Sequence, residues 1–146
     1  MGKRRRGREF AIQVLYGIEV SGEKPEGAIA RHCASFDVDS EAAGFAQSLI
    51  HGVVEHRDAL DTRIARASEN WRLDRMSAVD RNILRVALYE MIYSLEVPPV
   101  VAINEAIEIA KAYGTEASPP FINGILDQAS ATITTRAAKD DSEREP

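Results

Sequence analysis

The sequence has little of what would indicate a secreted, disulfide-stabilised or membrane-spanning protein. A single cysteine, Cys33, occurs among 146 residues, so no internal disulfide can form and a reducing compartment is expected. No apolar run approaches the length of about 20 residues that a membrane-spanning helix needs. The basic start of the chain is not followed by the apolar stretch of a secretory signal. These absences favour a cytoplasmic protein with no membrane association.

Motifs for nucleotide binding and for metal binding are also missing. Neither GxxxxGK[ST] nor GxGxxG occurs, and these glycine-rich loops are what hold the phosphates of nucleotides. His51 and Glu55 are one helical turn apart, but two ligands without further ligands at a motif spacing do not indicate a metal site. Cys33 lies on the apolar stripe of its predicted helix and is interpreted as a buried structural thiol. The sequence therefore predicts no catalytic site, no cofactor and no metal.

Helical periodicity is present in almost every segment instead. Apolar residues recur at the three- and four-residue spacing of amphipathic helices, and no segment alternates for long enough to be a strand. Asp39 or Ser40 is expected to cap the third helix, and Ser77 the helix that follows Trp71. The pattern predicts an all-α fold of about seven helices in two packed bundles.

The helices are expected to form one domain over residues 1–135. Its N-terminal bundle covers about 1–70 and its C-terminal bundle about 71–135. Residues 136–146, RAAKDDSEREP, lack apolar residues other than two alanines and are predicted to be a disordered tail.

One helix is expected before Gly114 in the C-terminal bundle, and another after it. Pro98 and Pro99 interrupt the pattern, so the first of these helices is predicted from about Ile103. Gly114 is placed directly after this helix, and Ser118 at the start of the last one.

The charge of the chain is unevenly distributed along its length. The formal net charge is −5, yet five of the first eight residues are basic: Lys3, Arg4, Arg5, Arg6 and Arg8. Guanidinium groups donate paired hydrogen bonds to phosphate and stack on aromatic rings. This run leads directly into an amphipathic helix, which would hold it against a folded surface. The pattern favours a nucleic-acid contact over a solvated tail.

Two other charged clusters are interpreted as structural. Glu105 and Glu108 lie on one helical face, which we interpret as solvated, with Glu108 paired to Lys111. Arg81 and Arg85 are one turn apart, and neighbouring aspartates could pair with them.

An ordered set of motifs resembles the NusB family of transcription antitermination factors. The motifs are RRRGREFAIQVLYGIE, NWRLDRMSAVDRNILRVALYEMIYSLEVPPVVAINEAIEIAKAYG and PPFINGILDQ, which together cover about half of the chain. The resemblance implies an all-α fold of two packed bundles and no catalysed reaction. It also implies binding to the boxA element of ribosomal RNA leader transcripts together with NusE, a ribosomal protein of the small subunit. The pair would then join RNA polymerase and other Nus factors in the antitermination complex.

The resemblance also assigns roles to individual residues. By position, it places RNA binding on four arginines and one aromatic residue: Arg4, Arg5, Arg6, Arg8 and Phe121. Phe121 lies in SPPFING, a stretch that matches the loop-to-helix segment beside the RNA in the family, and an aromatic ring can stack on an unpaired base. Tyr16 and Asp80 match positions near the NusE contact.

The residues alone leave two other classes of function open. A helical scaffold that binds only proteins would use its basic start against an acidic partner, or not at all. An enzyme fragment would need a cofactor-binding loop, which the sequence lacks. The oligomeric state is open as well, because the apolar positions of the first helix could serve the core or a homodimer contact.

Overall fold

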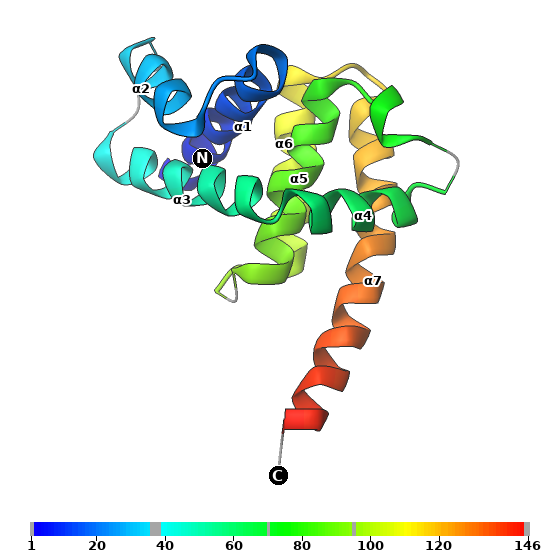
Figure 1. Ribbon diagram of the computed structural model, residues 1–146. Coiled ribbons are helices and arrows are strands. Elements are labelled where there is room, and N and C mark those ends of the chain that lie inside the picture. Colours follow the sequence, from blue (N-terminus) through cyan, green and yellow to red (C-terminus); the bar gives the residue numbers. More distant parts are fainter. Residues whose placement is uncertain (1, 36–38, 70, 95, 145–146) are drawn as a thin grey trace.

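The computed structural model describes residues 2–35, 39–69, 71–94 and 96–144. Within these ranges the chain forms seven α-helices and one short 3-10 helix, and no strand (Figure 1). The helices are α1 Lys3–Ser21, α2 Pro25–Ser35, α3 Ser40–Glu55, α4 Arg57–Ala67, η1 Leu73–Arg75, α5 Ala78–Tyr93, α6 Pro99–Tyr113 and α7 Ser118–Arg144. The predicted all-α fold of about seven helices is confirmed.

Two of the predicted helix caps are present. The carboxylate of Asp39 accepts a hydrogen bond from the backbone N–H of Ala42 at 2.8 Å, at the start of α3. The hydroxyl of Ser77 accepts one from the backbone N–H of Asp80 at 3.1 Å, at the start of α5. Each cap satisfies a donor that the first turn of the helix leaves without a partner.

The C-terminal helices are longer than the sequence predicts. α6 begins at Pro99 rather than near Ile103, because proline suits the first turn of a helix, where its missing N–H is not needed. α7 is assigned over Ser118–Arg144 and so overlaps residues 136–144 of the segment predicted as a disordered tail, and the disorder of that tail stays a prediction. The last two residues of that segment lie outside the described residues.

One hydrophobic core connects all seven helices. Its fully buried side chains come from every part of the chain and include Phe10, Leu49, Ile64, Leu84 and Leu126. Burying side chains of this size contributes about 1.5–3 kcal/mol each before conformational entropy is subtracted. α5 lies at the centre, in contact with α1, α3, α4, α6 and α7. α4 packs on α5 and α7, which joins it to the C-terminal helices.

Cys33 is exposed, so the prediction of a buried thiol was wrong. α2 packs on α1 and α3, and its buried side chains are Ala28 and Ile29. Cys33 lies one turn beyond Ile29, near the end of the helix, and its side chain faces solvent. Among the described residues, no helix is both long enough and apolar enough to cross a membrane.

Gly7 allows α1 and α3 to approach closely. A Cβ atom at this position would lie 2.8 Å from Cδ2 of Phe45 and 2.9 Å from the backbone oxygen of Ala42. The backbone oxygen belongs to α3 and cannot rotate away. Because Gly7 has no side chain, Phe45 of α3 has room to pack against the basic start of α1.

Replacing Gly7 with alanine is expected to destabilise the protein by about 1–3 kcal/mol, because the added methyl group overpacks the contact between α1 and α3. Gly44→Ala is the matched control. It lies inside α3 with no atom within 4 Å of an added Cβ, and alanine there should stabilise the helix by up to about 1 kcal/mol. Equilibrium unfolding in urea measures both changes, and equal effects at the two positions would contradict the close approach.

Candidate nucleic-acid interface

The first two turns of α1 place basic side chains beside the segment that leads into α6. A hollow of about 480 Å³ lies between them, and we call it the arginine groove. It is lined by Gly2, Arg4, Arg5, Arg8, Glu96, Val97, Pro98, Val101 and Glu105. The groove thus contains three of the arginines that the resemblance assigns to RNA binding.

Arg4 and its exposed neighbours carry the accessible positive charge. The guanidinium carbon of Arg4 lies 4.8 Å from the centre of the Phe45 ring, a cation–π contact that holds the side chain over α3. Among the described residues, no carboxylate pairs with Arg4. Arg6 is exposed and lies 3.4 Å from Glu9, and Lys3 is exposed beside Glu41. Exposed ion pairs of this kind are weak, so these cations can exchange their partners for phosphate.

Arg5 is paired with Glu105 of α6. Its Nε and Nη2 donate to the two carboxylate oxygens at 2.9 and 2.7 Å, in a bidentate geometry. The hydrogen bond from Arg5 lowers the pKa of Glu105 below its usual value, so the carboxylate is ionised at neutral pH. The prediction that Glu105 belongs to a solvated face was wrong, whereas Glu108 does pair with Lys111 at 2.8 Å.

Arg8 is buried, with only 4% of its surface exposed. Its Nε and Nη2 donate to Glu90 of α5 at 2.7 and 2.8 Å, and its Nη1 reaches Glu105 at 3.5 Å. Its guanidinium also lies 5.3 Å from the ring centre of Phe45. These contacts hold α1 on α5 and leave little of the guanidinium open to solvent. RNA binding by Arg8 stays a prediction.

A second buried network connects the end of α1 to α4 and α5. Arg85 donates to Asp61 at 2.7 Å and to Glu19 at 2.7 Å, and Arg81 donates from Nε to Glu19 at 3.1 Å. Burial opposes ionisation of Glu19, but the hydrogen bonds from Arg81 and Arg85 outweigh it and lower the pKa. The partners of Arg81 and Arg85 thus come from α1 and α4, whereas the neighbouring Asp74 pairs with Arg72 at 3.1 Å.

A mainly apolar hollow follows the arginine groove along α1, and we call it the tyrosine hollow. It is lined by Glu9, Ile12, Gln13, Tyr16, His32, Val79, Ile109 and Tyr113. Tyr16 is 44% exposed, which is high for an aromatic residue on a packed helix. Asp80 follows Val79, and its Oδ1 is buried and accepts no hydrogen bond within the described part of the chain. An unpaired buried oxygen of this kind costs free energy in the folded protein.

Phe121 lies away from the arginine groove, at the start of α7. Figure 1 shows the starts of α1 and α7 well separated in the molecule. Phe121 is half-buried and meets Trp71 edge to face, with ring centres 5.8 Å apart. Trp71 is the more exposed of the two rings. The structure therefore places the predicted aromatic residue and the predicted arginines in two separate places.

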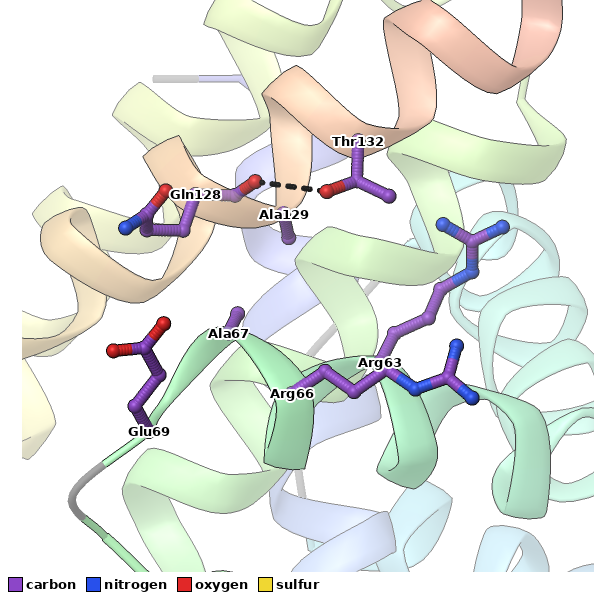
Figure 2. Close-up of a pocket in the computed structure, with 7 residues that line it drawn as sticks. All are labelled: Arg63, Arg66, Ala67, Glu69, Gln128, Ala129 and Thr132. Carbon is purple, nitrogen blue, oxygen red and sulfur yellow. Dashed lines mark hydrogen bonds between the residues drawn. The ribbon is translucent and has the colours of Figure 1, made fainter.

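A further hollow lies between α4 and α7 (Figure 2). Arg63, Arg66, Ala67 and Glu69 line it from the α4 side, and Gln128, Ala129 and Thr132 from α7. The hydroxyl of Thr132 donates to the backbone oxygen of Gln128 at 3.4 Å, so this polar contact stays within α7. The hollow contains none of the predicted site residues and has charges of both signs.

Comparison with known proteins decides the family. Residues 5–131 match the family model described as NusB family. The chain belongs to the NusB family. The transcription antitermination protein NusB of Anaeromyxobacter dehalogenans (strain 2CP-1) is 47% identical over 132 residues, which cover 90% of this chain and 92% of that protein. That relative is named a transcription antitermination protein, not an enzyme, in agreement with the prediction that this protein is not an enzyme.

Solved NusB structures have the same fold. Thermotoga maritima NusB is 40% identical with a TM-score of 0.80, over 88% of this chain and 90% of that one. A chain from a structure of the antitermination factors NusB and NusE in complex with double-stranded RNA is 26% identical. It has a TM-score of 0.82, over 90% of this chain and 98% of that one.

Glu90 is a buried charged residue that the sequence reasoning missed, although the sequence carries a signal for it. It follows Ile83 and Ala87 at helical spacing on the apolar stripe of α5. A carboxylate in such a position needs a buried cation. The spacing could have marked Glu90 as paired, but nothing in it identifies Arg8 as the partner. Phe45 and Tyr113 were missed as well, because each looks like an ordinary helix residue until its neighbours are known.

Replacing Arg8 with methionine is expected to destabilise this NusB-family protein by about 3–5 kcal/mol, because the buried Glu90 carboxylate loses its partner. The double variant Arg8→Met with Glu90→Leu should recover most of that loss, since it leaves no buried charge unpaired. Equilibrium unfolding in urea at neutral pH compares the two. A double variant as unstable as the single one would contradict the assignment of Arg8 and Glu90 as a mutually dependent pair.

Proposed function

We propose that this protein is an RNA-binding transcription antitermination factor that acts in the cytoplasm with NusE. The pair recognises the boxA element of ribosomal RNA leader transcripts and joins the RNA polymerase antitermination complex. Membership of the NusB family is the observation that carries the proposal. The solved complex of a relative with NusE and RNA supports it, and so does the exposed basic start of α1.

RNA contacts the start of α1 in this proposal. Lys3, Arg4 and Arg6 provide exposed positive charge for phosphates, and Arg5 lies beside them in the arginine groove. Their positions are set before RNA arrives, because α1 is packed on α3 and Arg4 rests on a ring of α3. Pre-ordered side chains lose less conformational entropy on binding, which favours affinity.

Phe121 provides a second contact for the RNA. Together with Trp71 it forms an aromatic pair at the start of α7, on which an unpaired base can stack. The distance from the arginine groove requires an extended RNA strand that reaches both places. Phosphate contacts at α1 would supply affinity, and base contacts at the aromatic pair would supply sequence preference.

NusE occupies the tyrosine hollow in this proposal, with contacts to Tyr16 and Asp80. Exposed tyrosines in an apolar hollow are typical of protein contacts, since one ring buries a large area at little entropic cost. Glu9 lines the tyrosine hollow and also contacts Arg6. A protein bound in the hollow would therefore lie directly beside RNA at the start of α1, which accounts for joint recognition.

Fluorescence anisotropy of a labelled boxA RNA, with and without NusE, tests the proposed function. A shuffled RNA of the same length and composition is the control. We expect NusE to tighten binding of the boxA RNA and to leave the shuffled RNA weakly bound. Equal affinity for both RNAs in the presence of NusE would contradict specific recognition.

Replacing Arg4 and Arg6 with alanine is expected to weaken RNA binding, because two phosphate contacts are lost. The slope of log K against log salt should flatten by about 0.7 for each phosphate no longer neutralised. Stability should change little, because both side chains are exposed. Arg66→Ala is the matched control on α4, and a larger effect there would place the RNA at the hollow of Figure 2 instead.

Replacing Tyr16 with alanine is expected to weaken NusE binding about tenfold or more, because an aromatic anchor of the contact is removed. RNA binding by the protein alone should be unchanged. Tyr93→Ala is the control, since Tyr93 is 41% exposed on α5 but stacks on His56 away from the hollow. Calorimetric titration with NusE measures the effect. If Tyr16→Ala instead changes only the oligomeric state in sedimentation, the hollow is a homodimer contact.

A further inference from the structure

Arg5 differs from every other basic residue at the start of α1. Arg4 and Arg6 are exposed, and Arg8 is buried, whereas Arg5 lies between these extremes with 29% of its side chain exposed. It lines the arginine groove, so a phosphate in the groove would meet it. Yet one edge of its guanidinium is closed by Glu105, which is itself 18% exposed. Arg5 is thus accessible and already paired.

The closed edge is the one best suited to phosphate. Nε and Nη2 point in parallel, and such pairs of N–H groups bind a carboxylate or a phosphate in the same bidentate geometry. Glu105 occupies both groups at 2.9 and 2.7 Å. A phosphate that uses this edge must first displace the carboxylate.

Glu105 is held firmly in this position. It lies on α6 between Ala102 and Ile109, which are both buried in the core, so the helix cannot turn the carboxylate away. Nη1 of Arg8 also donates to this carboxylate, at 3.5 Å. The carboxylate is also ionised at neutral pH, because the hydrogen bond from Arg5 lowers its pKa.

We propose that Glu105 is a specificity-determining residue for RNA, which masks Arg5 from RNA that offers only phosphates. This inference rests on the proposed function. Binding without sequence preference depends on phosphate contacts and would gain from every free guanidinium. Binding of the specific RNA depends also on base contacts, and the pair of Arg5 with Glu105 stays closed in that complex. Discrimination is a difference between two affinities, and Glu105 increases it by lowering the unwanted one.

The test compares wild type with Glu105→Gln, using boxA RNA with NusE and shuffled RNA. The variant should bind shuffled RNA about three- to tenfold more tightly, as one charge-assisted contact is released. Its salt slope on shuffled RNA should steepen by about 0.7, the value for one more phosphate neutralised. Affinity for boxA RNA with NusE should change little, so the ratio of the two affinities falls. Glu105→Ala, which removes the acceptor altogether, should show the same changes more strongly.

Glu108→Gln is the matched control. It removes the same charge from α6 one turn away, and Glu108 is paired with Lys111 instead of an arginine of the groove. It should change neither the salt slope on shuffled RNA nor the ratio of the two RNA affinities.

The double variant with Arg5→Ala is a second control. In the Arg5→Ala background, Glu105→Gln should have no further effect on shuffled RNA, because no guanidinium is left to release. Circular dichroism confirms that each variant is folded.

The outcomes separate this inference from the proposed function. If wild type fails to distinguish boxA RNA from shuffled RNA with NusE present, the proposed function is overturned. If wild type discriminates and Glu105→Gln leaves shuffled-RNA binding unchanged or weaker, Glu105 only anchors α1 to α6. If Glu105→Gln tightens both RNAs equally, Glu105 lowers affinity without setting specificity, and the inference is overturned.

Discussion

The buried ion pair between Arg8 and Glu90 is the constraint on which the functional surface depends. It connects the second turn of α1 to the central helix, α5. Both side chains are buried, and neither charge could be buried there without the other. Removing two charges from water costs free energy, and their attraction offsets that cost only when the groups are in direct contact. The pair therefore favours the one packing of α1 on α5 that brings Arg8 to Glu90. Gly7, the residue before Arg8, lets α1 lie close enough to α3 for the same guanidinium to rest near Phe45. The inward direction of the Arg8 side chain therefore sets the directions in which the neighbouring side chains of α1 project.

Helix geometry then distributes the remaining charges of the basic run. Successive residues point about 100° apart around a helix, so the neighbours of an inward-pointing arginine must point elsewhere. Arg4 lies one turn before Arg8, with its guanidinium over the ring of Phe45. Arg5 faces α6, and Arg6 faces solvent beside Glu9. A run that looks uniform in sequence becomes four different environments. Only some of its charge is available to an external phosphate.

The same arrangement places acidic side chains around the basic run. Carboxylates face most cations of the basic run, with Glu41 beside Lys3, Glu105 beside Arg5 and Glu90 beside Arg8. A basic segment surrounded in this way attracts phosphates less strongly than its charge suggests. α1 also presents the tyrosine hollow directly beyond the arginine groove, so one helix supports both proposed contacts. Partner and RNA would meet along this helix.

The local features of the fold could be predicted from the order of the amino acids. Periodicity and capping residues predicted seven helices and the caps at Asp39 and Ser77, and the ordered motifs predicted the family. These features depend on residues within a few positions of one another. Only the packing of the helices shows which arginine is buried, which is paired with a carboxylate of α6 and which is exposed. Arg8 and Glu90 are 82 residues apart, and Arg5 and Glu105 are 100 apart. Periodicity shows which face of a helix is apolar, but a buried charge is explained only by the partner that packing brings to it.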